Sequence, residues 1–409
     1  MKIDPHAKTV QLNIRDVEFF NNPYPIYHEI RQRCPIFYWE TYSMWSFVSH
    51  EDVSTLLRHR ALGRQITHIL TPEEVGLPPE PPHLKPFYDA DRYSLLALEP
   101  PDHTRLRGLV QKAFMARQIR KLQPRIAELA HRLIDGMQRK DRFDLITDFG
   151  TPIPVIVIAE LLGVPTEMAN DLLNWSHAMV KMYHLERTEE AEKEAVEASI
   201  AFVSFLRELV AERRQAPKDD LISHLIEVEE IGEKLTEDEL ISTCILLLNA
   251  GHEATVNVIG NGIYALLKHR DQLERWRSDP MLGSSAVEEL MRFDTPLHVF
   301  DRYVLKDFEY KGRGFKQGEK ILLVLGAANR DPAVFEDPDR LDIGRKRNPH
   351  VSLGGGIHYC LGAPLARLEL ETSLSILIER LPDLSLVEEP VFQNSYHFHG
   401  LERLILTSK

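Results

Sequence analysis

Cysteine is scarce in this chain of 409 residues, which contains only Cys34, Cys244 and Cys360. An odd and widely spaced set of cysteines does not form a disulfide framework and is typical of a protein from a reducing compartment. No C-x-x-C pair is present, which argues against a cysteine-rich zinc site. If the protein has a sulfur ligand, that cysteine therefore acts alone.

Long hydrophobic runs are also missing. No stretch reaches the about 18 apolar residues that a membrane-spanning helix needs, and segment 153–164 is interrupted by Pro154 and Glu160. The N-terminal residues lack the apolar core of a signal peptide. We therefore expect a cytoplasmic protein with no membrane partner.

An excess of positive charge is absent as well, because 49 basic residues stand against 62 acidic ones, a net charge of −13. Such a chain has no overall positive field to attract nucleic acid, so we expect no nucleic-acid partner. Hydrophobic residues make up 43% of the sequence, which is enough for a sizeable core. No internal repeat or low-complexity tract is found.

Helical patterns dominate from about residue 102 to 280. Thr236 and Glu239 form a capping box that opens a helix of about 32 residues, ending near Lys268. This helix is apolar on several faces and should cross the middle of the molecule. Strands are expected at 44–48, 308–310, 321–325 and 403–406. The fold class is therefore mainly α (α+β).

Prolines crowd the segment between residues 72 and 86, which predicts an irregular surface loop without regular helix. Long irregular loops in compact domains are often functional. Apolar residues such as Phe87 and Leu95 allow part of this loop to pack against the core.

The most informative segment runs from Ser352 to Pro364. Three consecutive glycines, residues 354–356, allow a tight turn and close approach to a flat ligand. Cys360 follows directly before a predicted helix that has Pro364 in its first turn. The positive end of a helix favours a thiolate, which is the form that binds iron. The alternative is a buried, inert cysteine beside a glycine-rich turn.

This segment resembles the haem-binding loop of the cytochrome P450 family, F-x-x-G-x-H/R-x-C-x-G. The resemblance implies that Cys360 is the metal ligand of haem b, with O2 as co-substrate. It also implies that Leu353, Gly354, His358 and Gly362 contact the cofactor. Leu353 departs from the usual phenylalanine, which affects redox potential and haem retention rather than ligation.

A second resemblance lies upstream, where Glu289 and Arg292 match the family's E-x-x-R helix. Alone this spacing means little, because such pairs are common on solvated helices. Its value comes from order, since the meander-like segment 335–342 and then the cysteine loop follow it. The resemblance implies a structural salt bridge in the core beneath the haem.

The long helix carries Ala250, Gly251, Glu253, Ala254 and Thr255, which resemble the family's A-G-x-D/E-T catalytic motif. Ala254 occupies the threonine position, and Thr255 lies about 100° further around the helix, so it does not simply replace that threonine. We hypothesise that Glu253 relays protons through an ordered water. A helix-interior role for Thr255 is as well supported as a catalytic one.

Haem propionates need cations or hydrogen-bond donors. In the family, positions equivalent to His103, Arg107, Arg302 and His358 face the propionates, and we expect the same here. Each of these residues taken singly also fits a solvated charge. All four positions match the family pattern at once, which favours a role in binding the haem over four unrelated solvated charges.

The same resemblance predicts the substrate pocket. Its walls should be mostly apolar, with Asn249, His298 and His397 as hydrogen-bond donors. The expected substrate is medium-sized and mainly apolar, with one or two oxygens. The predicted contacts are Leu95, Leu246, Asn249, Ala250, Leu297, His298, Val299, Phe300, Tyr396, His397 and Phe398.

The resemblance spans the chain and implies a single cytochrome P450-like domain over 1–409, a helical bundle around a long central helix with small antiparallel sheets. The implied activity is a monooxygenase that inserts one oxygen atom of O2 into a C–H bond. No flavin or reductase motif is present, so electrons should come from a ferredoxin and its NAD(P)H-dependent ferredoxin reductase. The basic run 345–347 is either solvated or borders the face that receives them. Two alternatives remain, namely a peroxide-driven peroxygenase and a non-catalytic haem-binding sensor or carrier.

Overall fold

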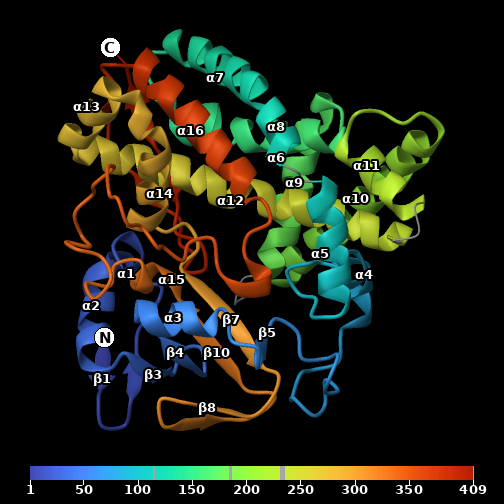
Figure 1. The fold of residues 1–409 in the computed structure, drawn as a ribbon, viewed down its shortest axis with the longest axis vertical. Helices are drawn as coiled ribbons and strands as arrows, with labels where there is room; N and C mark the ends of the chain where they lie inside the picture. The colour runs from blue at the N-terminus through green and yellow to red at the C-terminus, as the bar shows by residue number, and fades with distance from the viewer. Residues whose placement is uncertain (114–115, 184–186, 231–234, 409) are drawn as a thin grey trace. The chain divides into compact units, whose positions relative to one another are not determined.

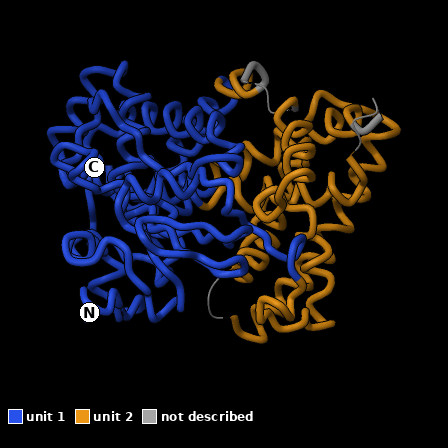
Figure 2. Tube along the Cα trace, turned by 60° about the horizontal axis from the view of Figure 1, so that its bottom comes forward, with its two compact units in different colours: residues 1–70, 124–151, 254–409 blue, residues 71–123, 152–253 orange. Residues whose placement is uncertain are grey.

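The computed structural model describes residues 1–113, 116–183, 187–230 and 235–408. The chain divides into two compact units that alternate along the sequence (Figure 2). Unit 1 comprises residues 1–70, 124–151 and 254–409, and unit 2 comprises residues 71–123 and 152–253. The expectation of one domain over the whole chain stays a prediction.

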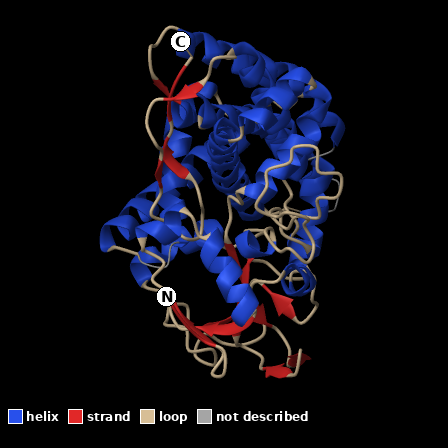
Figure 3. Cartoon of the chain, turned by 90° about the vertical axis from the view of Figure 1, so that its left-hand side faces the viewer, coloured by secondary structure: helices blue, strands red, loops and turns tan. Residues whose placement is uncertain are grey.

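Unit 1 contains the main sheet, whose seven strands follow the order β1-β2-β3-β4-β10-β7-β5. Strands are drawn in red in Figure 3. Strand β10 pairs in parallel with β4, and β2 pairs in parallel with β3, whereas the remaining neighbours are antiparallel. The strands are β1 (Lys2–Asp4), β2 (Thr9–Gln11), β3 (Ile36–Trp39), β4 (Met44–Phe47), β5 (Leu62–Gly63), β7 (Val299–Val304) and β10 (Lys320–Val324).

Three smaller antiparallel sheets complete the β structure of unit 1, as predicted. The main sheet differs from the prediction because it is mixed. Strands β4 and β10 are far apart in the sequence, so a long connection is available for the parallel pair. The small sheets use β6 (Phe143–Asp144), β8 (Phe308–Tyr310), β9 (Arg313–Phe315), β11 (Ser385–Leu386), β12 (Val391–Phe392), β13 (Leu401–Arg403) and β14 (Ile405–Thr407).

Helices of unit 1, among them α2 (Tyr24–Arg33) and α3 (His50–Leu56), lie beside the main sheet (Figure 1). An aromatic-rich core lies between α2 and the sheet, with Phe19, Tyr27, Trp39 and Val324 buried together. The helices are α1 (Val17–Asn21), α2 (Tyr24–Arg33), α3 (His50–Leu56), α7 (Gln123–Gln138), α13 (Arg270–Ser278), α14 (Gly283–Phe293), α15 (Leu325–Ala328) and α16 (Ala363–Arg380), with a π-turn at Ile146–Gly150.

Unit 2 is helical in the part that the structure describes. Helix α10 packs against α9 and α4, and the buried Arg213 Nε donates to Asp220 Oδ2 at 2.6 Å. The helices are α4 (Lys85–Asp91), α5 (Asp102–Ala113), α6 (Ala116–Lys121), α8 (Pro152–Leu162), α9 (Ala169–Val180), α10 (Glu189–Gln215) and α11 (Leu221–Glu230).

Helix α12 (Glu237–Lys268) is the predicted long helix of 32 residues and contributes to both units. Its capping box is present, since Thr236 N–H donates to Glu239 Oε2 at 2.8 Å and Glu239 N–H donates to Thr236 Oγ1 at 3.2 Å. Among the described residues, no helix combines the length and hydrophobicity that crossing a bilayer requires.

Two local predictions were wrong in detail. Helix α4 begins inside the proline-rich segment, because Pro86 lies in its first turn, where the missing N–H has no helical partner to lose. The strand predicted at 403–406 is two strands, β13 and β14, separated by Leu404.

Candidate haem-thiolate site

The backbone around Cys360 is shaped by glycines. Gly354 and Gly356 have φ angles of +72° and +69°, a region that side chains rarely adopt. A Cβ atom added at Gly356 would lie 2.7 Å from the Leu57 carbonyl oxygen, which is too close for a real contact. Only glycine therefore fits at position 356. The turn packs directly against the backbone that follows α3.

Two backbone hydrogen bonds fix the position of Cys360 at the end of this turn. Its N–H donates to the Leu353 carbonyl at 2.9 Å, and Ala363 N–H, at the first residue of α16, donates to the Cys360 carbonyl at 3.4 Å. Cys360 is half-buried and is in no disulfide. Pro364 lies in the first turn of α16, as predicted. The sulfur therefore sits one turn before a helix N-terminus and remains accessible to a ligand.

Hydrogen bonds tie the start of the cysteine loop to α14 and α15. Ser352 Oγ donates to the Met291 carbonyl at 2.7 Å, and Asn329 Nδ2 donates to Ser352 Oγ at 2.7 Å. Asn329 Oδ1 also accepts from Val351 N–H at 2.8 Å. The loop is thus held by the helix that carries the E-x-x-R pair.

That pair is a fully buried salt bridge, with Glu289 and Arg292 both 0% exposed. Arg292 Nε and Nη2 each donate to one Glu289 oxygen at 2.8 Å, a bidentate geometry. Arg292 Nη1 also donates to the Asn329 and Pro338 carbonyls at 2.9 and 2.8 Å. These hydrogen bonds therefore attach α14 to the chain segment that precedes the cysteine loop.

Arg345 is a member of this network that the sequence analysis missed. Its Nε donates to Glu289 Oε2 at 3.1 Å, and Asn348 Nδ2 donates to the same oxygen at 3.2 Å. Arg345 was interpreted only as part of a basic surface run. No spacing rule links residues 289 and 345, so this contact depends on the fold.

On α12, one face is less buried than the rest. Leu246, Gly251, Glu253 and Ala254 are partly exposed, and Ala250 is exposed, whereas the residues between Leu246 and Ala250 are buried. Spacings of four and seven to eight residues place Leu246, Ala250 and the Glu253–Ala254 pair on one face of the helix. These are the positions that the sequence motif assigned to oxygen and substrate.

Thr255 is buried, with 5% of its surface exposed, whereas Ala254 is half-buried. The role of Thr255 stays a prediction. Burial raises the pKa of Glu253 to about 7. Within the described residues of this face, Glu253 is the titratable side chain.

Other predicted residues of unit 2 are buried. His103, in α5, is 1% exposed, its N–H donates to the Glu99 carbonyl at 3.0 Å, and Arg107 lies one turn further along. Leu95 is buried, and Asn249 Nδ2 contacts the Met179 sulfur at 3.8 Å. Their roles stay predictions.

In unit 1, Arg302 is 2% exposed and lies on β7. The Phe300 ring lies close to two guanidinium groups, with Arg64 Cζ at 4.2 Å and Arg302 Cζ at 4.5 Å from its centroid. Asp301 pairs with Arg64 and Lys320, which hold the pKa of its carboxyl well below its usual range although burial opposes them. Arg302 is therefore the buried cation of β7, next to an Asp301 whose charge is paired with Arg64 and Lys320.

The structure brings two predicted substrate-contact segments of unit 1 together. Leu297 and Phe398 form a β-bridge, and His298 N–H donates to the His397 carbonyl at 3.0 Å. Residues 297–300 and 396–398 are thus neighbours, although about 100 residues separate them in the sequence.

Some of these side chains belong to the core rather than to an accessible surface. Tyr396 and Val299 are part of the aromatic-rich core cluster, and Tyr27 Oη donates to Tyr396 Oη at 3.0 Å. The His298 ring pairs with Tyr27 Oη at 2.9 Å, and burial lowers its pKa well below the usual value. Their contact with substrate stays a prediction, and His397 and Phe398 are the more accessible members of the set.

A half-buried thiol on a glycine turn, placed before a helix and braced by a buried Glu–Arg pair, has the features expected of a haem-thiolate enzyme. The family model for cytochrome P450 matches residues 40–397. The chain belongs to the cytochrome P450 family.

Individual relatives agree with this assignment. The chain is 38% identical to the polyketide biosynthesis cytochrome P450 PksS of Bacillus subtilis, over 98% of this chain and 97% of that protein. It is 36% identical to the biotin biosynthesis cytochrome P450 of the same organism, covering 98% and 99%. The crystal structure of P450BioI with hexadec-9Z-enoic acid ligated acyl carrier protein matches with a TM-score of 0.89 at 35% identity, covering 96% and 99%.

Family membership makes the protein an oxidoreductase, a haem-thiolate monooxygenase that binds haem b, uses O2 and acts on an organic substrate with electrons from redox partners. The residues of unit 1 fit this cofactor. They provide an accessible thiol, open space beside Gly362 and the two cationic or donor side chains of Arg302 and His358.

Replacing Glu289 with alanine leaves two buried guanidinium groups without their shared carboxylate. We expect the free energy of unfolding to fall by about 3–5 kcal/mol, measured by urea denaturation. The matched control is Glu29→Ala, which breaks the exposed Glu29–Arg33 pair and should cost less than about 1 kcal/mol. Equal losses in both variants would contradict the bracing role of Glu289.

Proposed function

We propose that Cys360 is the thiolate ligand of the haem iron and that His103, Arg107, Arg302 and His358 hold the propionates. The supporting observation is the glycine turn that presents an accessible Cys360 sulfur before α16. When bound, the haem supplies activation of O2 for insertion of one oxygen atom into a C–H bond. The chain's own residues bind and orient the substrate, exclude water and deliver protons.

Serine in place of Cys360 keeps the size of the side chain but removes the thiolate. We expect the variant to lose the thiolate-type spectrum of the reduced carbon-monoxide complex and the monooxygenase activity. Absorption spectra of matched amounts of haem-loaded protein measure this. Cys244→Ser, a buried thiol outside the turn, is the control and should keep the parent spectrum. A parent-like spectrum in Cys360→Ser overturns the assignment.

For the substrate, we propose a medium-sized, mainly apolar molecule with one or two oxygens. In unit 2, Leu246 is partly exposed and Ala250 is exposed, and in unit 1 His397 and Phe398 are partly exposed, so each unit offers mainly apolar side chains. Related structures were solved with hexadec-9Z-enoic acid on acyl carrier protein, with myristic acid and with testosterone. Long-chain fatty acids, free or carrier-bound, and steroids are therefore the first compounds to screen by spin-state change.

We propose further that Glu253 passes protons to the oxygen-binding side of the haem through ordered water, because Ala254 provides no hydroxyl there. With a substrate identified by its spin shift, Glu253→Gln should lower product formation about 10²-fold and raise peroxide release per NAD(P)H consumed. Asp238→Asn, on the exposed first turn of the same helix, is the control. Unchanged coupling of electrons to product in Glu253→Gln argues against this role.

Because Ala254 replaces the family's usual threonine, a peroxide-driven peroxygenase is the alternative to test. Turnover driven by hydrogen peroxide, with none from ferredoxin and NAD(P)H, would favour that alternative over the monooxygenase route.

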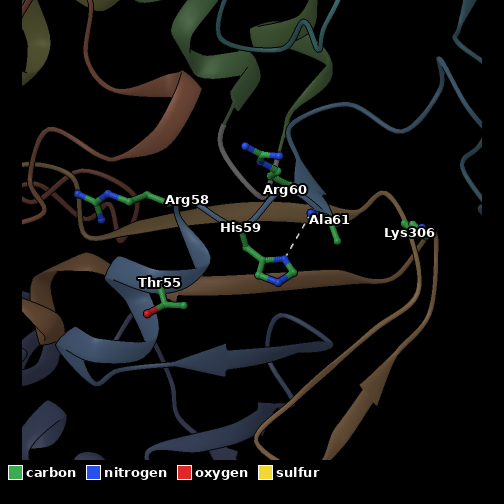
Figure 4. A pocket seen from close by; sticks show the side chains of 6 residues that line it. All are labelled: Thr55, Arg58, His59, Arg60, Ala61 and Lys306. Carbon is green, nitrogen blue, oxygen red and sulfur yellow. Dashed lines mark hydrogen bonds between the residues drawn. The ribbon is translucent and has the colours of Figure 1, made fainter.

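For the electron donor, we propose an acidic ferredoxin reduced by an NAD(P)H-dependent reductase. A basic groove, shown in Figure 4, is lined by Arg58, His59, Arg60 and Lys306 among others. It adjoins the cysteine loop, since a Cβ atom at Gly355 would lie 3.3 Å from the Arg58 guanidinium. Opposite charges at such a surface accelerate association and fix orientation.

Reversing the charge at the groove should therefore weaken docking. We expect Arg58→Glu to raise the KM for ferredoxin about fivefold at low salt, an effect of about 1 kcal/mol, with less change at high salt. The control is Arg139→Glu, an exposed arginine just after α7 with the same change of charge. Equal KM changes in both variants would contradict docking at this groove.

A further inference from the structure

Three potential metal ligands of unit 2 lie together, two of them within the catalytic motif of α12. His177 comes from α9, and His252 and Glu253 come from α12. One ligand atom from each residue lies within 4.8 Å of the other two. The two imidazole rings have centroids 5.4 Å apart and are tilted by 45°.

One ring nitrogen of His252 is available to bind a metal ion. It is 2% exposed, and its Nδ1 lies 2.9 Å from the Leu248 carbonyl oxygen. A carbonyl only accepts hydrogen bonds, so Nδ1 carries the proton and Nε2 carries the lone pair. This Nε2 has no hydrogen-bond partner among the described residues. A buried lone pair without a partner is costly, and a bound cation would remove that cost.

The donor set matches borderline divalent metals. Two imidazoles and one carboxylate with an open fourth position are the ligands that zinc takes in open sites. The hydrogen bond from His252 Nδ1 to a backbone carbonyl is the outer contact that typically orients a metal-binding histidine. His177 is exposed, so the group is accessible to an ion from solvent.

A second group with similar residues, Asp294, His298 and His399 in unit 1, differs in these respects. Both His399 ring nitrogens are already within hydrogen-bond distance of partners, with Asp294 Oδ1 at 2.8 Å and the Phe20 carbonyl at 2.9 Å. Both histidines of that group are buried. His298 Nε2 also has no hydrogen-bond partner among the described residues, but this group has no exposed histidine comparable to His177 through which an ion would enter.

We infer that His177, His252 and Glu253 form a binding site for a divalent transition-metal ion such as Zn²⁺, which takes Glu253 as its carboxylate ligand. Binding itself is independent of turnover. Its consequence rests on the proposed function, because a metal-bound Glu253 no longer passes protons. Zn²⁺ should then lower coupled product formation reversibly, and a chelator should restore it.

The direct test is isothermal titration calorimetry of Zn²⁺ into tag-free, substrate-free, haem-loaded protein in a buffer that does not bind zinc. We expect one site in the parent protein. Loss of an outer-shell partner costs roughly 10–100-fold in affinity, so His177→Ala and Glu253→Gln should each weaken binding at least ~100-fold. His83→Ala is the control, because His83 is an exposed histidine of the same unit with one carboxylate neighbour, Glu192, at 3.1 Å.

X-ray diffraction from zinc-soaked crystals, recorded at the zinc absorption edge, locates the bound ion. Anomalous density between His177, His252 and Glu253 supports the site. No zinc binding by the parent protein, or parent-like binding in both His177→Ala and Glu253→Gln, overturns it. Zinc binding at these residues without loss of product formation contradicts the proton role of Glu253 and leaves the metal site intact.

Discussion

The haem-thiolate chemistry of this chain depends on a steric constraint at Gly356. A side chain at this position would collide with the Leu57 carbonyl, and the positive φ angle excludes most other residues. The turn is therefore fixed by backbone contact, and Cys360 leaves it with its N–H bonded to Leu353. A cysteine held through the backbone keeps its position when the surrounding side chains vary.

A network of buried polar groups extends this constraint through unit 1. Glu289 and Arg292 bind the segment around Pro338, and Arg345 joins them. Asn329 and Ser352 continue the network to the cysteine loop. The E-x-x-R pair and the cysteine loop thus belong to one hydrogen-bonded structure. Removing one charge inside it leaves the others unpaired, which is more costly than losing an exposed ion pair.

The sequence was sufficient for features that depend on local spacing. The capping box at Thr236, the length of α12 and Pro364 in the first turn of α16 follow from short-range rules. Contacts between distant segments were not accessible in this way. Arg345 on Glu289 and the His177–His252 pair arise from packing between elements, and sequence spacing carries no signal for them.

The central claim is that the Cys360 sulfur binds the haem iron, and X-ray absorption at the iron edge of the resting ferric protein tests it most directly. We predict one sulfur in the first coordination shell, together with the porphyrin nitrogens. A first shell made only of nitrogen and oxygen would contradict the account, whatever the activity of the preparation.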